Sequence, residues 1–346
     1  MEATPTPKRF VSLSERLYRL LLLSYPKKFR QTYSREMLLT FRDCRREALR
    51  QYGTQGIAHL WSFMLRDLAA TVVIEHYKTF VTQWKRFLGL EEKEYATLFT
   101  PFKFSLNVGQ RTDIGRQRKS NEDNMTTIIP EDPEVLGKRG ALFVVSDGLG
   151  GHEKGEVASE LAVRAISEAY YQDENDNVEQ SLRQAIQRAN TAIHQRGNGM
   201  GTTCVVAVLQ GDTVFVANVG DSRAYLIRDG QFKQISRDHS IVAEELRAGL
   251  ITKEQARNHP QINIITRCLG TSDDVEVDTF AEPVQEGDLL LLCTDGLTNQ
   301  LTDEELAKIV HELQPTESVQ QLIERANEQG GPDNITAIVV QVSSAA

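Results

Sequence analysis

The chain has 346 residues, 40% of them hydrophobic, and a formal net charge of −9 at pH 7. This composition is typical of a globular protein with one or two ordinary cores. The charge is uneven, because residues 1–95 hold 17 lysines and arginines against 10 acidic residues, and the remainder holds 22 against 38. The acidic C-terminal part argues against nucleic acid as a main partner, since duplex binding depends on cations that neutralise phosphates.

The cysteines and the short apolar runs indicate a reducing compartment. No CxxC pair occurs among the four widely spaced cysteines, so neither a zinc ribbon nor a disulfide framework is expected; they are Cys44, Cys204, Cys268 and Cys293. The apolar run after Arg19 is too short for a signal peptide or a membrane span. We expect a cytoplasmic protein that could associate with a membrane through its basic N-terminal part.

Residues 12–88 have the pattern of helices only. Ser12 precedes Glu15 by three residues, which is the capping-box spacing, and apolar residues then recur at intervals of three and four. Pro26 ends the first predicted helix. The sequence therefore predicts a small all-helical domain over residues 1–95, whose basic charge could bind anionic lipid, an acidic partner or the rest of the chain. A charged stretch, "GLEEKEYATLF", marks the join, and a linker is predicted over residues 96–104.

From residue 105 to residue 343 the pattern changes to short strands. The strand-like runs are "ALFVVSD", "TTCVVAVLQ", "TVFVANVG", "RAYLIRDG", "LLLLCTD" and "TAIVVQV". Gly211-Asp212 and Asp229-Gly230 predict hairpin turns between successive runs. The predicted helices, over 157–171, 178–196, 303–313 and 316–328, lie outside the strand blocks. This arrangement predicts an antiparallel α+β domain.

Aspartates next to glycine follow three of the predicted strands, and a fourth precedes the last strand: Asp147, Asp221, Asp295 and Asp333. Any one of them could simply cap a turn. Several carboxylates that converge repel one another unless cations neutralise them, and oxygen ligands favour Mg²⁺ or Mn²⁺ over zinc. We expect the strand to end at Asp147, where Gly148 allows a sharp turn and offers its carbonyl to a metal.

An arginine-rich segment, "GRQRKSNEDN", precedes the first of these aspartates. It places Arg116 and Arg118 just before Glu122 and Asp123. A guanidinium group offers a fork of donors to phosphate oxygens, so this pattern suits a phosphorylated substrate. The same spacing could equally give a surface ion pair. Asp123 could orient the site.

Eight motifs in this order resemble the bacterial form of the metal-dependent PPM/PP2C family of serine/threonine phosphatases. They are "RKSNED", "VVSDGLGGH", "GTT", "VANVGDSRAYLI", "DHS", "TRCLG", "LLCTDGLTNQL" and "GGPDNITAIVV", spread over residues 107–342. The resemblance implies a sandwich of two antiparallel β-sheets flanked by helices, with the metals at one end. It also implies hydrolysis of phosphoserine and phosphothreonine by a hydroxide that bridges two Mn²⁺ or Mg²⁺ ions.

The resemblance carries over roles residue by residue. Asp147 would bridge the two metals, and Gly148 would contribute its carbonyl. Asp295 and Asp333 would be ligands of the first metal. Glu122 would belong to the second metal, through water.

Arg118 would bind the substrate phosphate, and Asp221 with Asp295 would form a weaker third-metal site. The chain departs from the family pattern at two positions. Leu149 stands where some members have a histidine proposed as the leaving-group acid. Asn299 stands where some have an aspartate at the third metal, and a neutral amide there would weaken that site.

Residues 238–270, here called the flap, resemble the family's segment beside the active-site cleft. The segment mixes polar and apolar residues, which is typical of a mobile loop that faces substrate. His239 and His259 are candidates for phosphate or metal contact, but ordinary hydrogen-bonded roles are the favoured interpretation. We expect the flap to influence substrate choice.

The N-terminal stretch "LYRLLLLSYPKKFRQTYSREMLLTFRDCRREA" resembles, less specifically, the helical prefix of some bacterial permeases. That resemblance implies an interaction or membrane-proximal role and no chemistry. Its leucine and aromatic faces are expected to form a core.

Three functions remain compatible with the sequence. The leading hypothesis is a phosphatase that acts on phosphorylated proteins and opposes serine/threonine kinases. The alternative is a weak or inactive phosphatase fold that binds partners through its N-terminal domain; a chain of that kind should have lost Asp147, Asp295 or Asp333, and all three are present. A narrower version of the enzyme, an anti-anti-sigma-type regulator, stays open.

Overall fold

The computed structural model describes residues 18, 21–25, 38 and 41, and then residues 102–344 apart from 151–152, 198 and 258. The chain divides into two compact units, Met1–Tyr95 and Ala96–Ala346. In the first unit, Tyr18 stacks on Phe41 with ring centroids 4.2 Å apart, and a 3-10 turn, η1, spans Leu22–Ser24. The all-helical domain predicted over 1–95 and the linker predicted over 96–104 otherwise lie outside the described residues and stay predictions.

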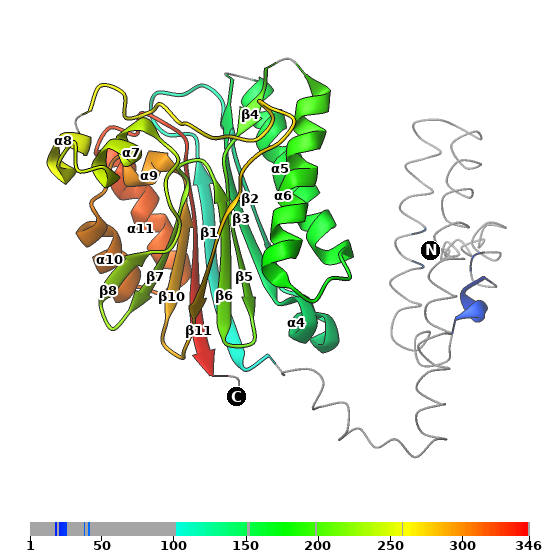
Figure 1. Ribbon diagram of the computed structural model, residues 1–346. Helices are drawn as coiled ribbons and strands as arrows, with labels where there is room; N and C mark the ends of the chain where they lie inside the picture. The colour runs from blue at the N-terminus through cyan, green and yellow to red at the C-terminus, as the bar shows by residue number, and fades with distance from the viewer. Residues whose placement is uncertain are drawn as a thin grey trace, which may run out of the picture. The chain divides into compact units, whose positions relative to one another are not determined.

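Two antiparallel β-sheets form the centre of the second unit (Figure 1). The first sheet has the order β1-β11-β10-β7-β8, and its strands are β1 (Phe104–Asp113), β7 (Arg223–Arg228), β8 (Gln231–Gln234), β10 (Leu289–Cys293) and β11 (Ile335–Ser344). The second has the order β2-β3-β5-β6-β9, with β4 paired to β3, and its strands are β2 (Asp123–Ile128), β3 (Ala141–Leu149), β4 (Gly201–Thr202), β5 (Cys204–Gln210), β6 (Thr213–Val219) and β9 (Asp278–Pro283).

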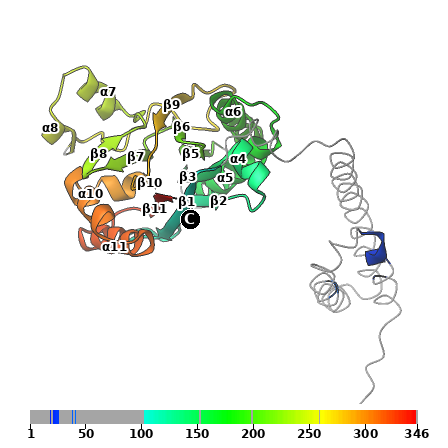
Figure 2. The same cartoon turned by 90° about the horizontal axis from the view of Figure 1, so that it is seen from below.

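Helices cover the outer face of each sheet, so the unit has four layers (Figures 1 and 2). α5 and α6 pack on the second sheet, and α10 and α11 pack on the first. The helices are α4 (Pro133–Arg139), α5 (Glu153–Gln172), α6 (Val178–Arg196), α7 (Ile241–Arg247), α8 (Lys253–Arg257), α9 (Asp295–Thr298), α10 (Asp303–Glu312) and α11 (Pro315–Glu328). Among the described residues, none of the helices combines the length and apolar character that crossing a bilayer requires.

The predicted α+β sandwich with two antiparallel sheets is confirmed. The four predicted long helices correspond to α5, α6, α10 and α11, with ends shifted by at most four residues. Both predicted hairpin turns form: β5 meets β6 at Gly211, and β7 meets β8 at Asp229, where φ is 60° and 50°, respectively. The flap contains α7 and α8, so it is more ordered than the loop that the sequence predicted.

The strand β3 is buried on both faces, which explains its unbroken apolar sequence. Ala141, Phe143 and Val145 point into the core between the two sheets. Leu142 and Val144 point to the other face, where α5 and α6 pack. The alternation of side chains along a strand therefore places five successive apolar residues in two different cores.

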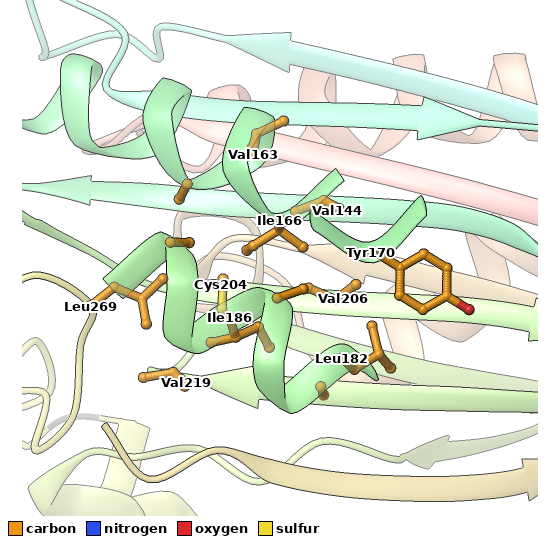
Figure 3. Packing of buried hydrophobic residues seen from close by; sticks show 14 of the residues in the cluster. Val144, Val163, Ile166, Tyr170, Leu182, Ile186, Cys204, Val206, Val219 and Leu269 are labelled. Atoms are coloured by element: carbon orange, nitrogen blue, oxygen red, sulfur yellow. The ribbon is translucent and has the colours of Figure 1, made fainter. Parts of the chain in front are cut away.

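The core under α5 and α6 joins the helices to the second sheet (Figure 3). Ile166 of α5 and Leu182 and Ile186 of α6 are fully buried against this sheet, together with Cys204 and Val206 of β5. Close packing of this kind fixes where α5 begins, and α5 follows directly on the end of β3 that carries Asp147.

One expectation about β3 was wrong. The strand does not stop at Asp147, because β3 continues through Gly148 to Leu149, which pairs with Gly201 of β4. Extra pairing with β4 holds the strand extended where the sequence suggested a sharp turn. The absence of a side chain at Gly148 instead allows β3 to pack closely against Gly155.

Replacing Ile186 by alanine should lower the free energy of unfolding by about 2–5 kcal/mol, because it leaves a cavity in a fully buried cluster. Arg188→Ala, on the exposed face of the same helix, is the matched control and should change stability by less than about 0.5 kcal/mol. Urea denaturation followed by circular dichroism measures both. Equal stability of the two variants would contradict the packing described here.

Candidate active site

Four separate segments bring the predicted aspartates to one end of the sandwich. Asp147 lies near the end of β3, Asp221 in the turn from β6 to β7, Asp295 at the first position of α9, and Asp333 just before β11. The charges of Asp221, Asp295 and Asp333 all act on Asp147. The structure thus brings the four residues together, although they are up to 186 positions apart in the sequence.

Hydroxyl groups hold the backbone of Asp147 in place. Its N–H donates to Thr203 Oγ1 at 3.0 Å, and its carbonyl accepts from Thr203 N at 2.9 Å and from Thr202 Oγ1 at 2.7 Å. Thr203 Oγ1 also lies 2.8 Å from Ser222 Oγ, next to Asp221. The two threonines of the "GTT" motif therefore fix the backbone of Asp147, and Thr203 also links it to the residue that follows Asp221.

Glu122 packs against glycines that leave it room. The Gly148 N–H donates to Glu122 O at 3.1 Å, and a Cβ on Gly148 would lie 2.2 Å from Gly155 O. A Cβ on Gly155 would lie 2.0 Å from Glu122 Oε2. Neither position therefore tolerates a side chain, so Gly148 serves close packing between β3 and the start of α5.

Burial and mutual repulsion raise the pKa of the clustered carboxyls. The pKa of Asp147 lies well above its ordinary value, first because of burial and then because of Asp123 and Asp295. Burial, Asp295 and Asp238 likewise raise the pKa of Asp221 well above its ordinary value. The pKa of Asp295 is raised by burial and by Asp333. Such a cluster favours protons or metal cations as counter-charges.

Asp123 belongs to the same cluster. Its place in the sequence had suggested only that it could orient the site. It lies directly opposite Asp147 in the β2–β3 register. Its Oδ2 accepts hydrogen bonds from Thr336 at 2.7 Å and Thr294 at 2.9 Å, whereas its buried Oδ1 has no hydrogen-bond partner among the described residues. Burial raises the pKa of Asp123 to about 7, although both threonine hydrogen bonds oppose the shift.

Arg118 lies exposed at the edge of this cluster. Its Nη2 donates to Asp333 Oδ2 at 2.7 Å, and Glu122 and Asp147 also attract it. Asn334 fixes the approach of this loop, since its Oδ1 accepts from the Glu122 N–H at 2.8 Å and its Nδ2 donates to two loop carbonyls, those of Ile114 and Ser120. The "PDN" part of the last motif could have indicated this anchor.

A cavity of about 750 Å³ extends from the cluster to the flap. Asp221, Asp295 and Asn299 line one end, and Asn299 Nδ2 donates to Asp295 Oδ2 at 3.0 Å. Side chains of α7 and α8 line another wall. Asp221, Asp295 and Asn299, the residues predicted for a third cation, therefore line one cavity. The side-chain amide of Asn299 is hydrogen-bonded to Asp295.

The two flap histidines have structural partners. His239 is buried; its Nδ1 accepts from Gly220 N at 3.1 Å, and burial and Arg267 lower its pKa. His259 Nδ1 accepts from Gln261 N at 3.2 Å. Both agree with the hydrogen-bonded interpretation that the sequence analysis favoured. Leu149 offers no proton, so the structure supplies no leaving-group acid at that position.

The chemistry of the donor set fits a hard divalent cation. Within the described part of the chain, no three His, Cys, Asp or Glu side chains are arranged closely enough to hold one metal ion as they stand. The clustered side-chain donors are nevertheless all carboxylate oxygens, which hard cations prefer. These carboxyls are buried, and their pKa values are raised. Among them, Asp123 Oδ1 is an acceptor without a hydrogen-bond partner in the described part of the chain. With Arg118 at its edge, the site has the composition of a divalent-cation centre that receives an anionic group such as phosphate.

Comparison with known proteins agrees with this class. The family described as protein phosphatase 2C matches residues 134–338. A serine/threonine phosphatase, stp, of Listeria monocytogenes is 43% identical over 242 residues, which cover 67% of this chain and 94% of that protein. Protein phosphatase PhpP of Streptococcus pneumoniae is 34% identical over 247 residues, covering 69% and 98% of the two chains.

Solved structures give the same result. The serine/threonine phosphatase Stp1 of Staphylococcus aureus superposes with a TM-score of 0.64 at 34% identity, covering 70% of this chain and 98% of that one. The catalytic domain of PstP, crystallised with two manganese ions, gives a TM-score of 0.61 at 33% identity and covers 70% and 100%. The chain belongs to the protein phosphatase 2C family of serine/threonine phosphatases in its bacterial form, as the motif resemblance predicted.

The raised pKa of Asp123 predicts how the metal-free protein responds to pH. The folded state holds a proton on Asp123 up to about pH 7, whereas the unfolded chain releases it near the ordinary value of 3.8. The free energy of unfolding in EDTA should therefore fall as pH rises between these values. Asp123→Asn should remove this loss and stabilise the protein at pH 8, with little effect at pH 4.

Thermal unfolding in EDTA across this pH range provides the measurement. Asp229→Asn, at an exposed hairpin turn where asparagine tolerates the positive φ of 50°, is the control and should leave the pH profile unchanged. An Asp123→Asn variant no more stable than the wild type at pH 8 would contradict the assigned cause.

Proposed function

We propose that this protein hydrolyses phosphoserine and phosphothreonine in protein substrates, and so opposes serine/threonine kinases, with Mn²⁺ or Mg²⁺ at the carboxylate cluster. The observation that carries the proposal is the convergence of buried carboxylates around Asp147 with Arg118 at their edge. The two manganese ions in the PstP catalytic domain, which is 33% identical to this chain, support the choice of cation. The names of the Listeria and Streptococcus relatives support the choice of reaction.

Our assignment of the cation ligands uses oxygen atoms only. Asp147 lies at the centre of the cluster and would be shared between two cations. The other assigned ligands are the Gly148 carbonyl, Asp295 and Asp333 for the first cation, Glu122 for the second, and Asp221 with Asp295 and the neighbouring Asn299 for a weaker third. Bound divalent cations would supply a water of lowered pKa and would stabilise the charge that develops on the phosphoryl group.

Arg118 is assigned to the substrate phosphate. Its guanidinium group is exposed, and in the structure only one of its nitrogens is engaged with Asp333. The remaining N–H donors can therefore bind phosphate oxygens in a forked geometry while the arginine stays beside the cluster. This pairing also limits how far Arg118 can move from the carboxylates.

Asp123 is assigned an orienting role at the site. Hydrogen bonds from Thr294 and Thr336 to its Oδ2 fix the carboxyl group opposite Asp147. Leu149 cannot protonate the leaving group, so solvent is assigned that step.

Phosphate release from phosphoserine and phosphothreonine peptides should require Mn²⁺ or Mg²⁺ and should be lost in excess EDTA. Asp147→Asn should lower turnover by at least about 1000-fold while the variant stays folded, since it removes the central carboxylate and relieves charge repulsion. Asp212→Asn, in the exposed hairpin between β5 and β6, should retain activity. Activity that persists in EDTA, or in Asp147→Asn, would refute the proposed function.

Arg118→Ala should lower kcat/KM for a phosphopeptide by about 10- to 100-fold, mainly through KM, because it removes charge-assisted hydrogen bonds to phosphate. Arg116→Ala changes another exposed arginine two residues away and is the matched control. Steady-state kinetics at saturating Mn²⁺ separates the two. If both variants show the same kcat/KM, Arg118 has no specific role in phosphate binding.

A further inference from the structure

The loop that carries Arg118 joins the two sheets. It runs over residues 114–122, here called the arginine loop, from β1 at one edge of the first sheet to β2 at one edge of the second. The side chains from Arg116 to Lys119 are all exposed. Packing of these side chains therefore cannot fix the loop, and the bonds that reach its backbone decide where Arg118 lies.

Asp113, the last residue of β1, binds two partners through one oxygen atom. Its Oδ1 accepts from the Gly115 N–H at 2.9 Å and from Asn327 Nδ2 at 3.1 Å. Asn327 is buried and lies in the last turn of α11. Gly115 has a φ of 80°, and a Cβ there would overlap the carbonyl oxygen of Asp333. The Asp113 carboxylate thus joins α11 to the tight turn with which the arginine loop begins.

Gly331, which follows α11, lies against both Asn327 and the arginine loop. Its carbonyl accepts from the Arg116 N–H at 2.7 Å, and its N–H donates to Ala326 O at 3.1 Å. Its φ is 44°, and a Cβ there would overlap Asn327 Oδ1. That oxygen is buried and has no hydrogen-bond partner in the described part of the chain. Two consecutive residues of the loop, Gly115 and Arg116, are therefore held from the end of α11.

Arg118 lies only two residues beyond this anchored pair, and its Nη2 donates to Asp333 Oδ2 at 2.7 Å. We propose that Asn327 is a positioning residue for phosphate binding. Through Asp113 it fixes the start of the arginine loop, and so it keeps the Arg118 guanidinium group at the edge of the carboxylate cluster. The inference rests on the proposed function, because Arg118 is assigned there to the substrate phosphate.

The expected effect follows from the cost of ordering a loop. Without the Asn327–Asp113 bond, the start of the loop is free to move, and phosphate must order Arg118 when it binds. The loss should therefore appear in KM and in the inhibition constant of inorganic phosphate. Mn²⁺ affinity should stay unchanged, because neither residue supplies an assigned cation ligand.

Steady-state kinetics of the full chain at saturating Mn²⁺ tests the inference. Asn327→Ala and Asp113→Ala should each raise KM for a phosphoserine peptide by about 3- to 10-fold, with kcat within about twofold of the wild type. The inhibition constant of inorganic phosphate should rise by a similar factor. Asp113 is only half-buried, so Asp113→Ala carries the test if Asn327→Ala does not fold. Asp113→Asn keeps the Oδ1 acceptor and should hold KM within about twofold of the wild type.

The same strand and helix supply a matched control at their other ends. Asn107 Nδ2 of β1 donates to Gln314 Oε1, at the N-cap of α11, at 3.2 Å. Asn107→Ala removes this bond and should leave KM unchanged. A double-mutant cycle shows whether Asn327 acts through Arg118: in an Arg118→Ala background, Asn327→Ala should change KM by less than about twofold. A merely structural role would act equally in both backgrounds.

The outcomes separate the inference from the proposed function. A higher KM that disappears as an effect in the Arg118→Ala background supports the positioning role. Wild-type KM in Asn327→Ala and Asp113→Ala, an equal rise in both backgrounds, or an equal rise in Asn107→Ala overturns the inference alone. An Asp113→Asn variant as impaired as Asp113→Ala also overturns it, because the acceptor oxygen would then have no part. A wild type without Mn²⁺-dependent hydrolysis overturns the inference and the proposed function together.

Discussion

Repulsion among carboxylates held together at one end of the sandwich is the constraint on which the rest of the site depends. Asp123, Asp147 and Asp221 all have pKa values raised mainly by burial and then by one another or by Asp295. Charges placed this way would destabilise the folded state without counter-charges, and two nearby arginines, Arg118 and Arg223, are too few to neutralise them all. Divalent cations, as proposed for this site, would resolve the conflict and would leave the site able to receive phosphate.

The four-layer fold makes this cluster possible by bringing distant turns to one place. Apolar strands buried on both faces fix the sheets, so the turns after β6 and β10 and before β11 converge on the end of β3. Hydroxyls of Thr202 and Thr203 then hold the backbone of Asp147, and Gly155, which has no side chain, leaves room for Glu122. Rigid packing behind the cluster holds it together, and side chains of the flap line the cavity beside it.

Much of the fold and of the candidate site could be predicted from the sequence, because strand runs, hairpin turns and motifs are local signals. The four aspartates were singled out by their positions beside strands and glycines, and Arg118 by its position before Glu122 and Asp123 and by the family resemblance. The roles of Asp123, Thr294, Thr336 and Asn334 depend on contacts between residues as many as 220 positions apart, for which a single sequence carries no local signal. The end of β3 was predicted wrongly for a similar reason, since its extension depends on pairing with the two-residue strand β4.

Counting the protons released when Mn²⁺ binds tests the central claim most directly. If the metal-free cluster holds protons on its buried carboxyls, Mn²⁺ must displace them at pH 7. Calorimetric titration of the full chain in buffers with different ionisation enthalpies measures that number. The account predicts a net release of about one proton or more per chain at pH 7, diminishing as the pH rises above the raised pKa values. Mn²⁺ binding at pH 7 without proton release would contradict it.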